Sequence, residues 1–335
     1  MLQLAKRFLK IKLLKSMKNF APILIPTLNR HVHFKRCVES LAICTYADQT
    51  DLYIALDYPL KESHWEGYKK ISIYLDEING FKSVNVIRRD KNLGARENIV
   101  DARNEIFKQY DRIIVSEDDN EFSPNFLDYI NVCLEKYENN ENVLAITGYN
   151  RMIDMNGYDK NIYSALSFCA WGFTISRKDY QFLQKEITNT AYAKKIIQSW
   201  SNSYKIYKRS PSLLRGLLSV AKTGTVTNDT MIVTYMILNN KYCIWPTVSK
   251  VRNHGFDGGG EHFGSIPDHP MLKQEIDTAS FFEPDDIEIK ENEVIKARTK
   301  QYAKQSLSLF KRLLFGVYIP LQYLIYRFTG IIIYK

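Results

Sequence analysis

The chain has 335 residues, of which 45% are hydrophobic and 13% aromatic, and this composition excludes an intrinsically disordered protein. Its formal net charge is +9, but residues 1–20 carry six Lys/Arg and residues 294–335 carry eight, with no acidic residue in either segment. Once these 14 are removed from the 46 Lys/Arg, 32 basic residues face 37 acidic ones, so a generally basic, nucleic-acid-binding body is also excluded.

The N-terminal arm, residues 1–19, interleaves cations with apolar residues at helical spacing. It lacks the uninterrupted apolar core and the small-residue cleavage site of a signal peptide. A basic amphipathic segment of this kind is typical of helices that lie on a membrane surface, with their Lys/Arg side chains near anionic headgroups.

The segment 20–150 alternates apolar strands with amphipathic helices. Strands are expected at 21–26, 51–57, 83–88 and 113–115, and helices at 33–43, 65–78 and 95–110. This alternation predicts an α/β fold with a mainly parallel sheet flanked by helices. Because ligands bind at the carboxyl ends of parallel strands, we expect the site at 27–30, Asp57, 88–94 and 117–120. No GxGxxG or P-loop motif is present, which disfavours a dinucleotide site and a P-loop enzyme.

Three adjacent carboxylates, Glu117, Asp118 and Asp119, end the fourth predicted strand. On an extended backbone Glu117 and Asp119 project to one side and Asp118 to the other. Such a cluster is costly unless a cation is bound, and hard oxygen ligands suit Mg²⁺ or Mn²⁺ with positions left for substrate phosphates. The alternative is an acidic turn that caps the helix starting near Ser123.

From 151 to 270 the alternation loosens. A strand is expected at 167–175, around Trp171 and Gly172, and the basic, serine-rich region 199–215 is predicted to be a flexible insert. Asp229 lies near the N-terminus of an apolar helix at 231–238. Four glycines within 255–260, beside two histidines, are typical of a lid that closes over a ligand.

The C-terminal extension, residues 271–335, ends in a second basic arm. Its run 313–326 is apolar for about 14 residues, short of the roughly 20 that a bilayer span needs. We expect this helix to lie on a membrane surface, and docking on the protein's own core is the alternative. The five cysteines form no CxxC pair, which favours buried, reduced thiols over disulfides or a zinc site.

Several short segments, in order and spacing, resemble the GT-A glycosyltransferases. They are Ile-Leu-Ile-Pro-Thr-Leu-Asn-Arg at 23–30, Asn-Leu-Gly at 92–94, Glu-Asp-Asp at 117–119 with Ser-Pro-Asn-Phe at 123–126, Trp-Gly at 171–172, Asn-Asp at 228–229, and Asn-His-Gly-Phe-Asp-Gly at 253–258 with His262. The resemblance is to the family 2-like, inverting group related to N-acetylglucosaminyltransferase I and its bacterial relatives. It covers residues 20–265 and implies a nucleotide-sugar-binding half, 20–150, and an acceptor-binding, catalytic half, 151–270.

The resemblance also implies roles for individual residues. Asp119, Glu117 and His262 would bind Mn²⁺ or Mg²⁺. The donor would be held by Thr27, Arg30, Asp57, Arg89, Asn92, Gly94, Asp118, Trp171 and Gly172. Within that set, Asp118 would contact the ribose or sugar, Asp57 the nucleobase, and the two arginines the nucleotide or diphosphate oxygens. Asp229 matches the catalytic base, and helix capping is its competing role.

The predicted activity is that of a metal-dependent, inverting hexosyl- or N-acetylhexosaminyltransferase. It would move a sugar from a nucleotide diphosphate, with UDP expected, to a glycan or lipid-linked acceptor in capsule or lipopolysaccharide synthesis, at the inner face of the cell membrane. Two alternatives stay open. A sugar nucleotidyltransferase would normally carry a Gly-rich basic loop, which is absent after Pro26. A non-catalytic membrane-bound scaffold would leave the acidic triplet and the segment 253–262 unexplained.

Overall fold

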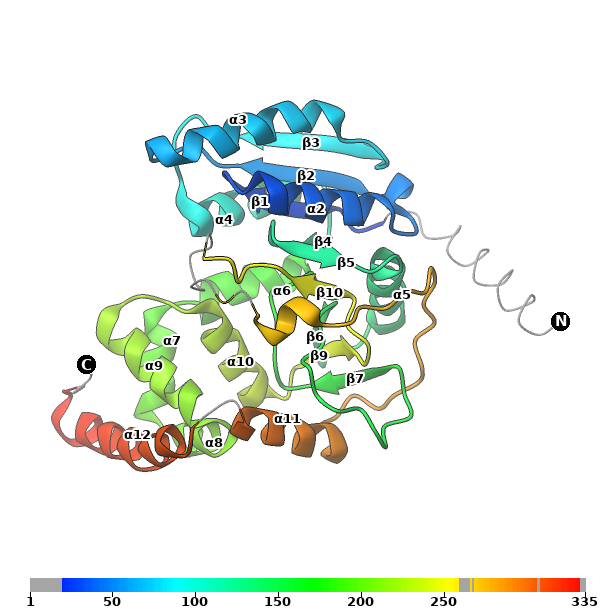
Figure 1. Cartoon of the computed structure of the whole chain (residues 1–335). Coiled ribbons are helices and arrows are strands. Elements are labelled where there is room, and N and C mark those ends of the chain that lie inside the picture. Colours follow the sequence, from blue (N-terminus) through cyan, green and yellow to red (C-terminus); the bar gives the residue numbers. More distant parts are fainter. Residues whose placement is uncertain (1–19, 259–265, 267, 306–307, 332–335) are drawn as a thin grey trace.

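A mixed sheet of eight strands forms the centre of the molecule, and helices cover both of its faces (Figure 1). The computed structural model describes residues 20–258, 266, 268–305 and 308–331, so the N-terminal arm and His262 lie outside the described residues. The strands of this sheet are β1 (Ile23–Thr27), β2 (Asp51–Leu56), β3 (Ser83–Arg88), β4 (Arg112–Val115), β6 (Val143–Thr147), β7 (Ile162–Ala165), β8 (Phe173–Ser176) and β9 (Tyr242–Pro246).

The order across the sheet is β3-β2-β1-β4-β8-β6-β9-β7. Neighbours β3, β2, β1 and β4 are parallel, as are β6 and β9, whereas β8 runs antiparallel to β4 and β6, and β7 antiparallel to β9. The predicted mainly parallel α/β fold is therefore confirmed. Strands from both predicted halves of the chain enter this one sheet, and the expected boundary at residue 150 falls between β6 and β7.

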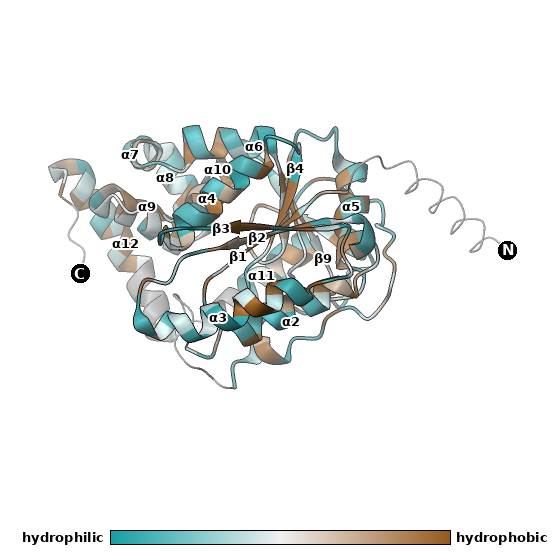
Figure 2. Cartoon of the chain, turned by 90° about the horizontal axis from the view of Figure 1, so that it is seen from above, coloured by the Kyte–Doolittle hydropathy of each residue, from teal (hydrophilic) through white to brown (hydrophobic). Residues whose placement is uncertain are grey.

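Uninterrupted apolar runs explain the central position of β1 and β4. Ile23, Leu24 and Ile25 are fully buried, and so are Ile113 and Ile114. A parallel strand that is covered on both faces needs such a run and not an alternating pattern. Figure 2 shows these apolar strands between helices whose outer surfaces are hydrophilic.

The helices form two layers and an outer cluster. Helices α2 and α3 lie on one face of the sheet, and α4, α6 and α10 lie on the other (Figure 2). The helices are α2 (His31–Ala42), α3 (Trp65–Tyr74), α4 (Gly94–Ile106), α5 (Phe126–Tyr137), α6 (Arg177–Phe182), α7 (Thr190–Gln198), α8 (Trp200–Arg209), α9 (Pro211–Thr223), α10 (Asn228–Asn239), α11 (Glu293–Gln305) and α12 (Leu309–Thr329).

The predicted flexible insert at 199–215 is wrong, because α8 and the start of α9 occupy it. Ser199 caps α8 by accepting a hydrogen bond from the backbone N of Asn202, and Pro211 opens α9 at a position where its missing N–H costs nothing. Ile206 and Leu214 are buried. The serines and the proline therefore mark helix boundaries in this region and do not form a linker.

Residues 268–292, between β10 (Val251–Asn253) and α11, run past α5 and the edge strand β7 before they reach α11 (Figure 1). Their anchor is Lys250, which is 1% exposed, pairs with Asp277 and lies 4.5 Å from the ring centre of Phe282. Further along, Asn161 and Asp285 each donate the backbone N–H to the other's side chain. The Ser164 hydroxyl donates to the Lys290 carbonyl and accepts from the Lys290 backbone N. This C-terminal strap holds α11 against the edge strand β7.

Helix α12 docks on the outer helical cluster through one face. Ile319 and Tyr323 are buried there, the ring of Tyr323 meets Trp200 of α8, and the Tyr207 hydroxyl donates to the Gly316 carbonyl. In the described part of the chain, no helix combines the length and the apolar character needed to cross a bilayer.

Candidate active site

The site begins where the two central parallel strands, β1 and β4, end side by side. Their register pairs Ile23 with Ile114 and Leu24 with Val115, so Thr27 at the end of β1 faces the acidic tip that follows β4. The Thr27 hydroxyl donates to Asp118 Oδ2 over 2.9 Å. The strand-end position predicted for these two residues is where the structure puts them.

Arg30, at the start of α2, supplies the positive charge of this tip. Its Nη1 lies 2.7 Å from Asp119 Oδ2 and 3.6 Å from Asp118 Oδ1, and its Nη2 lies 3.2 Å from Asp257 Oδ1. Burial lowers its pKa, but the hydrogen bond to Asp119 and the three carboxylate charges outweigh this and raise the pKa above its ordinary value. The guanidinium is thus permanently charged and joins two acidic segments of the chain.

A two-stranded ribbon brings the second of these segments to the tip. Strands β5 (Asn120–Phe122) and β10 (Val251–Asn253) pair antiparallel, directly after the acidic triplet and directly before the glycine-rich loop. The Asn253 side chain donates to Asp119 Oδ1 over 2.6 Å. At Gly255 a Cβ atom would collide with Asp119 Oδ2, so only glycine permits this approach.

Two carboxylates of the tip, Glu117 and Asp118, have pKa values far above their ordinary range. Burial, with Asp119 and Asp118 as the nearest like charges, raises the pKa of Glu117 to about 8. Burial and Asp119 also raise the pKa of Asp118 to about 7, against the opposing effect of Arg30. One guanidinium therefore does not balance three adjacent carboxylates, and the cluster is a strong candidate for a functional site.

Asp229 and Trp171 reach the same cluster from the second half of the chain. The charge of Asp229 contributes to the raised pKa of Glu117, and a hydrogen bond from the Trp171 side chain opposes that rise. Asp229 lies in the first turn of α10, whose N-cap residue is Thr227. It is therefore not the capping residue, and its role as a catalytic base stays a prediction.

Gly172 fixes the course of the chain beside Trp171. Its φ of +61° is in the left-handed region, and a Cβ would come within 2.9 Å of both Phe122 and Val251 in the β5–β10 ribbon. The ribbon can pack against β8 only because this residue has no side chain. Gly172 thus shapes the site by packing, and a contact of its own with a donor stays a prediction.

Four other predicted donor residues form a separate junction between β2 and α4. Asp57 is buried and accepts hydrogen bonds from the backbone N atoms of Tyr58, Leu93 and Gly94 at 2.8–2.9 Å. The Asn92 side chain donates to the Tyr58 carbonyl. These contacts attach the start of α4 to the end of β2, so in this structure the Asp57 carboxylate is engaged by the protein itself.

Arg89 belongs to this junction and not to the acidic tip. Its Nε donates to Asn98 Oδ1 over 2.8 Å, and its Nη1 pairs with Asp101 over 2.7 Å. Both partners lie on α4. The guanidinium is therefore tied to that helix, and contact with a diphosphate stays a prediction.

The chemistry of the tip fits a divalent cation. Carboxylate oxygens are the ligands that Mg²⁺ and Mn²⁺ prefer, and Mg²⁺ sites commonly use one or two carboxylates with substrate phosphates and water. Within residues 20–258, 266, 268–305 and 308–331, no three His, Cys, Asp or Glu side chains gather in a metal-binding geometry. Asp119 and Glu117, the predicted carboxylate ligands, can supply such a one- or two-carboxylate site, and the third predicted ligand, His262, lies outside the described residues.

Sequence reasoning did not assign roles to several residues of the site. Asn253 and Asp257 fall in the segment whose pattern was noted, and that pattern was the available signal. His33, whose Nε2 lies 3.2 Å from Asp257 Oδ2, carries no such signal. Arg103 of α4 lines a cavity together with Asp229, and its signal is a cation on the apolar face of a helix.

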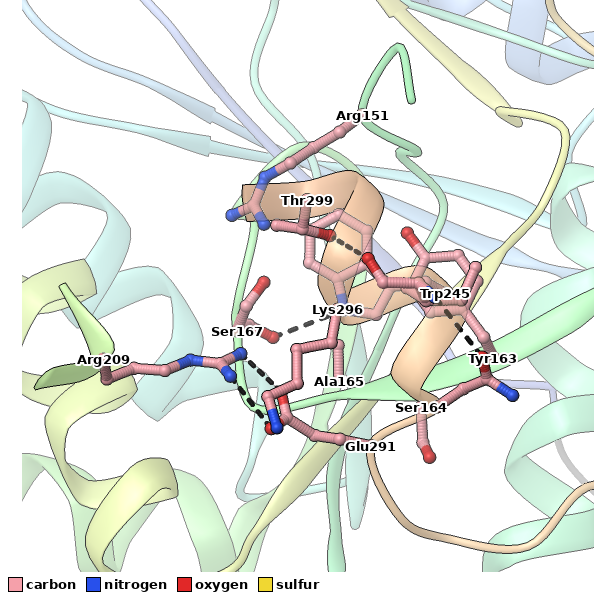
Figure 3. A pocket seen from close by; sticks show the side chains of 12 residues that line it. Arg151, Tyr163, Ser164, Ala165, Ser167, Arg209, Trp245, Glu291, Lys296 and Thr299 are labelled. Atoms are coloured by element: carbon pink, nitrogen blue, oxygen red, sulfur yellow. Dashed lines mark hydrogen bonds and ion pairs between the residues drawn. The ribbon is translucent and has the colours of Figure 1, made fainter. Parts of the chain in front are cut away.

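A smaller cavity of about 20 Å³ lies among β7, β9 and α11, away from every predicted site residue (Figure 3). Its charges are satisfied locally: Arg209 pairs with Glu291, and the Arg151 guanidinium lies 5.1 Å from the centre of the Trp245 ring. This cavity lies where α11, which the C-terminal strap holds in place, packs against β7 and β9.

No protein-family model matches the sequence, and no curated protein does. Among solved structures, S. aureus TarS matches with a TM-score of 0.34 and 10% identity over 50% of this chain and only 29% of its own. The mannosyltransferase PcManGT from Pyrobaculum calidifontis, in complex with GDP-Man and Mn²⁺, gives 0.36 and 9% over 67% and 72%. Mouse xyloside xylosyltransferase 1, apo form, gives 0.31 and 11% over 48% and 68%. These values are low, so the function is argued from the site.

Proposed function

We propose that this protein is a metal-dependent, inverting glycosyltransferase of the GT-A type that uses a nucleotide-diphosphate sugar, with UDP as the expected nucleotide. The observation that carries the proposal is that Asp229, in the first turn of α10, lies near enough to the acidic tip of β4 for its charge to raise the pKa of Glu117. This reaction needs carboxylates at two separate positions of one site. Those at the tip of β4 would bind the metal that holds the leaving diphosphate, and Asp229 would take the proton of the acceptor.

The residues at the tip of β4 would bind the sugar donor and the metal. Asp118, held by Thr27 and facing Arg30, is oriented to accept hydrogen bonds from ribose or sugar hydroxyls. Asp119, fixed by Asn253, is the proposed metal ligand together with Glu117. A bound divalent cation would supply the electrostatic stabilisation of the departing diphosphate. Arg30 would add a permanent cation within reach of the same oxygens.

Asp229 would act on the acceptor. It is solvent-exposed at the start of α10, so an acceptor hydroxyl can approach it. A carboxylate there can take the hydroxyl proton as that oxygen attacks the anomeric carbon from the side opposite the leaving group. One displacement of this kind inverts the anomeric configuration. A glycoside hydrolase would instead need two carboxylates that flank the scissile bond.

The acceptor is proposed to be a glycan or lipid-linked glycan of the cell envelope, reached at the cytoplasmic face of the membrane. Support comes from α12, whose outer face is apolar although it touches water: Val317 is 70% exposed and Phe328 80%. Phe310, Leu321 and Leu324 are also exposed at matching helical spacing. An apolar helix face beside basic residues is suited to the interface of an anionic membrane.

The test is a screen of nucleotide sugars for Mn²⁺-dependent thermal stabilisation, followed by release of the nucleotide in the presence of acceptor extracts. We expect UDP with Mn²⁺ to raise the melting temperature, and UDP alone to raise it much less. Asp119→Ala should abolish the Mn²⁺-dependent part. If no nucleotide stabilises the wild-type chain with Mn²⁺ or Mg²⁺, the proposed function is wrong.

A further inference from the structure

A cavity of about 90 Å³ lies between the sheet and the helices α4, α6 and α10, and Asp229 lies at its edge. A cavity of this volume has room for several water molecules, and therefore also for a carboxylate or phosphate group. Its apolar wall is formed by residues of β6, β8 and the segment before β8. Its polar side chains come from Arg103 of α4, Tyr180 of α6, Gln184 and Asn228.

Arg103 brings a positive charge into this cavity without a negative partner. Its guanidinium lies 5.6 Å from the ring centre of Phe173 and 5.5 Å from that of Tyr180. Its Nε is enclosed by the protein and makes no hydrogen bond, and no carboxylate of the described residues pairs with it. Desolvation lowers the pKa of the Arg103 guanidinium, with only Tyr180 opposing. Aromatic faces attract a guanidinium but cannot accept its N–H hydrogen bonds in the plane.

The Tyr180 hydroxyl is the polar group next to Arg103 in this cavity. It is buried, and its oxygen interacts with the Arg103 side chain, which leaves the hydroxyl proton available to donate. A buried charge is normally paired, and a guanidinium without a carboxylate calls for an explanation such as a missing ligand. A guanidinium and a phenol both offer hydrogen-bond donors, and a small anion can accept from both.

We propose that this cavity, here named the Arg103 pocket, binds an anionic group, a carboxylate or a phosphate, carried by the sugar acceptor. The anion would accept hydrogen bonds from Arg103 and Tyr180. Because Asn228 and Asp229 are adjacent residues on the wall of the same pocket, an anion held there would bring a hydroxyl of the same sugar to Asp229. The word acceptor rests on the proposed function, whereas the anion site stands on the pocket alone.

The test uses the full chain without nucleotide or metal, and probes it with sodium glucuronate, glucose 6-phosphate and neutral glucose at about 20 mM and constant ionic strength. We expect at least one of the two anionic sugars to raise the melting temperature by about 2 °C or more, as a ligand present at several times its dissociation constant does. Glucose should leave it unchanged. A response to glucuronate alone identifies a carboxylate site, and a response to glucose 6-phosphate alone identifies a phosphate site.

Arg103→Met keeps the packing against both rings and removes the charge. We expect it to lose the anion response while melting at the same or a higher temperature than the wild-type chain, because an unpartnered charge has been removed. Arg112→Met is the matched control, since Arg112 pairs with Glu138 elsewhere on the sheet, and it should keep the full response. Tyr180→Phe keeps the ring, removes the hydroxyl, and should weaken anion binding at least about threefold, which tests the pocket even if Arg103→Met does not fold.

Three results would overturn the proposal: no response to either anionic sugar, an equal response to glucose, or an undiminished response in Arg103→Met or Tyr180→Phe. The outcome is separable from that of the nucleotide screen. An anion response without any nucleotide response would refute the glycosyltransferase and leave the anion site standing. A nucleotide response without an anion response would do the reverse.

Discussion

Replacing Arg30 by Met tests the charge balance on which the site depends. The side chain is 14% exposed and its partner Asp119 11%, so the pair is largely withdrawn from water. Removal of one member of such a pair costs about 3–5 kcal/mol, because the other charge is left without its partner. With an unfolding entropy of about 2.1 cal/mol/K per residue, this predicts a fall in melting temperature of about 4–7 °C for this chain at slightly alkaline pH.

The fall in melting temperature should depend on pH, and the pKa of Asp118 decides whether it grows or shrinks as pH rises. Its pKa in the folded protein is raised from 3.8 to about 7, so the folded state binds more protons than the unfolded state, and stability falls as pH rises through this window. Arg30 limits that loss by favouring the ionised form. Its removal raises the pKa of Asp118 further, and the deficit of the variant should be smaller near pH 5 than near pH 8.

Differential scanning fluorimetry of both proteins across this pH range, in buffer with chelator, measures the effect. Arg89→Met is the matched control, because Arg89 is 12% exposed and pairs with Asp101 on α4, outside the acidic tip. Its deficit should be the same at both ends of the range. If the deficit of Arg30→Met is equally independent of pH, the electrostatic account of the tip is refuted.

Three further predictions concern the catalytic carboxylate, the C-terminal strap and the outer helix. Asp229→Asn should lower turnover at least about a hundredfold and leave calorimetric binding of UDP with Mn²⁺ unchanged; full turnover would remove Asp229 from the mechanism. Lys250→Met should destabilise the fold by about 3–5 kcal/mol, because Asp277 loses its partner, and should speed hydrogen exchange in the strap; unchanged exchange would contradict the anchor. Leu321→Ser with Phe328→Ser should weaken binding to anionic vesicles about tenfold or more at unchanged helicity, and undiminished binding would exclude this face from the membrane contact.

The central sheet was predictable because its strands carry their own signal. The buried runs of β1 and β4 are continuous and β-branched, and the acidic triplet at the end of β4 marks the functional edge. Only the resemblance to a known family predicted that Asp229 and Glu117 belong to one site. These residues are far apart in the chain, and no local sequence pattern connects them.

What the sequence did not predict depends on long-range packing. The strands β5 and β10 are short and become strands only by pairing with each other across a long stretch of chain. The segment 199–215, which holds α8 and the start of α9, is rich in Ser, Lys and Arg, and the burial of its apolar residues is decided by the neighbouring helices. Arg103 is a cation on the apolar face of α4, and only the fold shows that Phe173 and Tyr180 surround it.

The charge balance of the tip has a consequence for how the site fills. Among the described residues, Arg30 is the permanent cation paired with the tip, whereas Glu117, Asp118, Asp119 and Asp229 are all acidic. Burial and, after it, the repulsion between these carboxylates raise the pKa values of Glu117 and Asp118. A nucleotide diphosphate is itself an anion and would add to that repulsion if it entered alone. A divalent cation attracts both partners, so each should increase the affinity for the other by the same factor. Arg30 belongs to the chain and cannot dissociate with the product as a bound cation can. It therefore also stabilises the fold when neither cation nor nucleotide is bound.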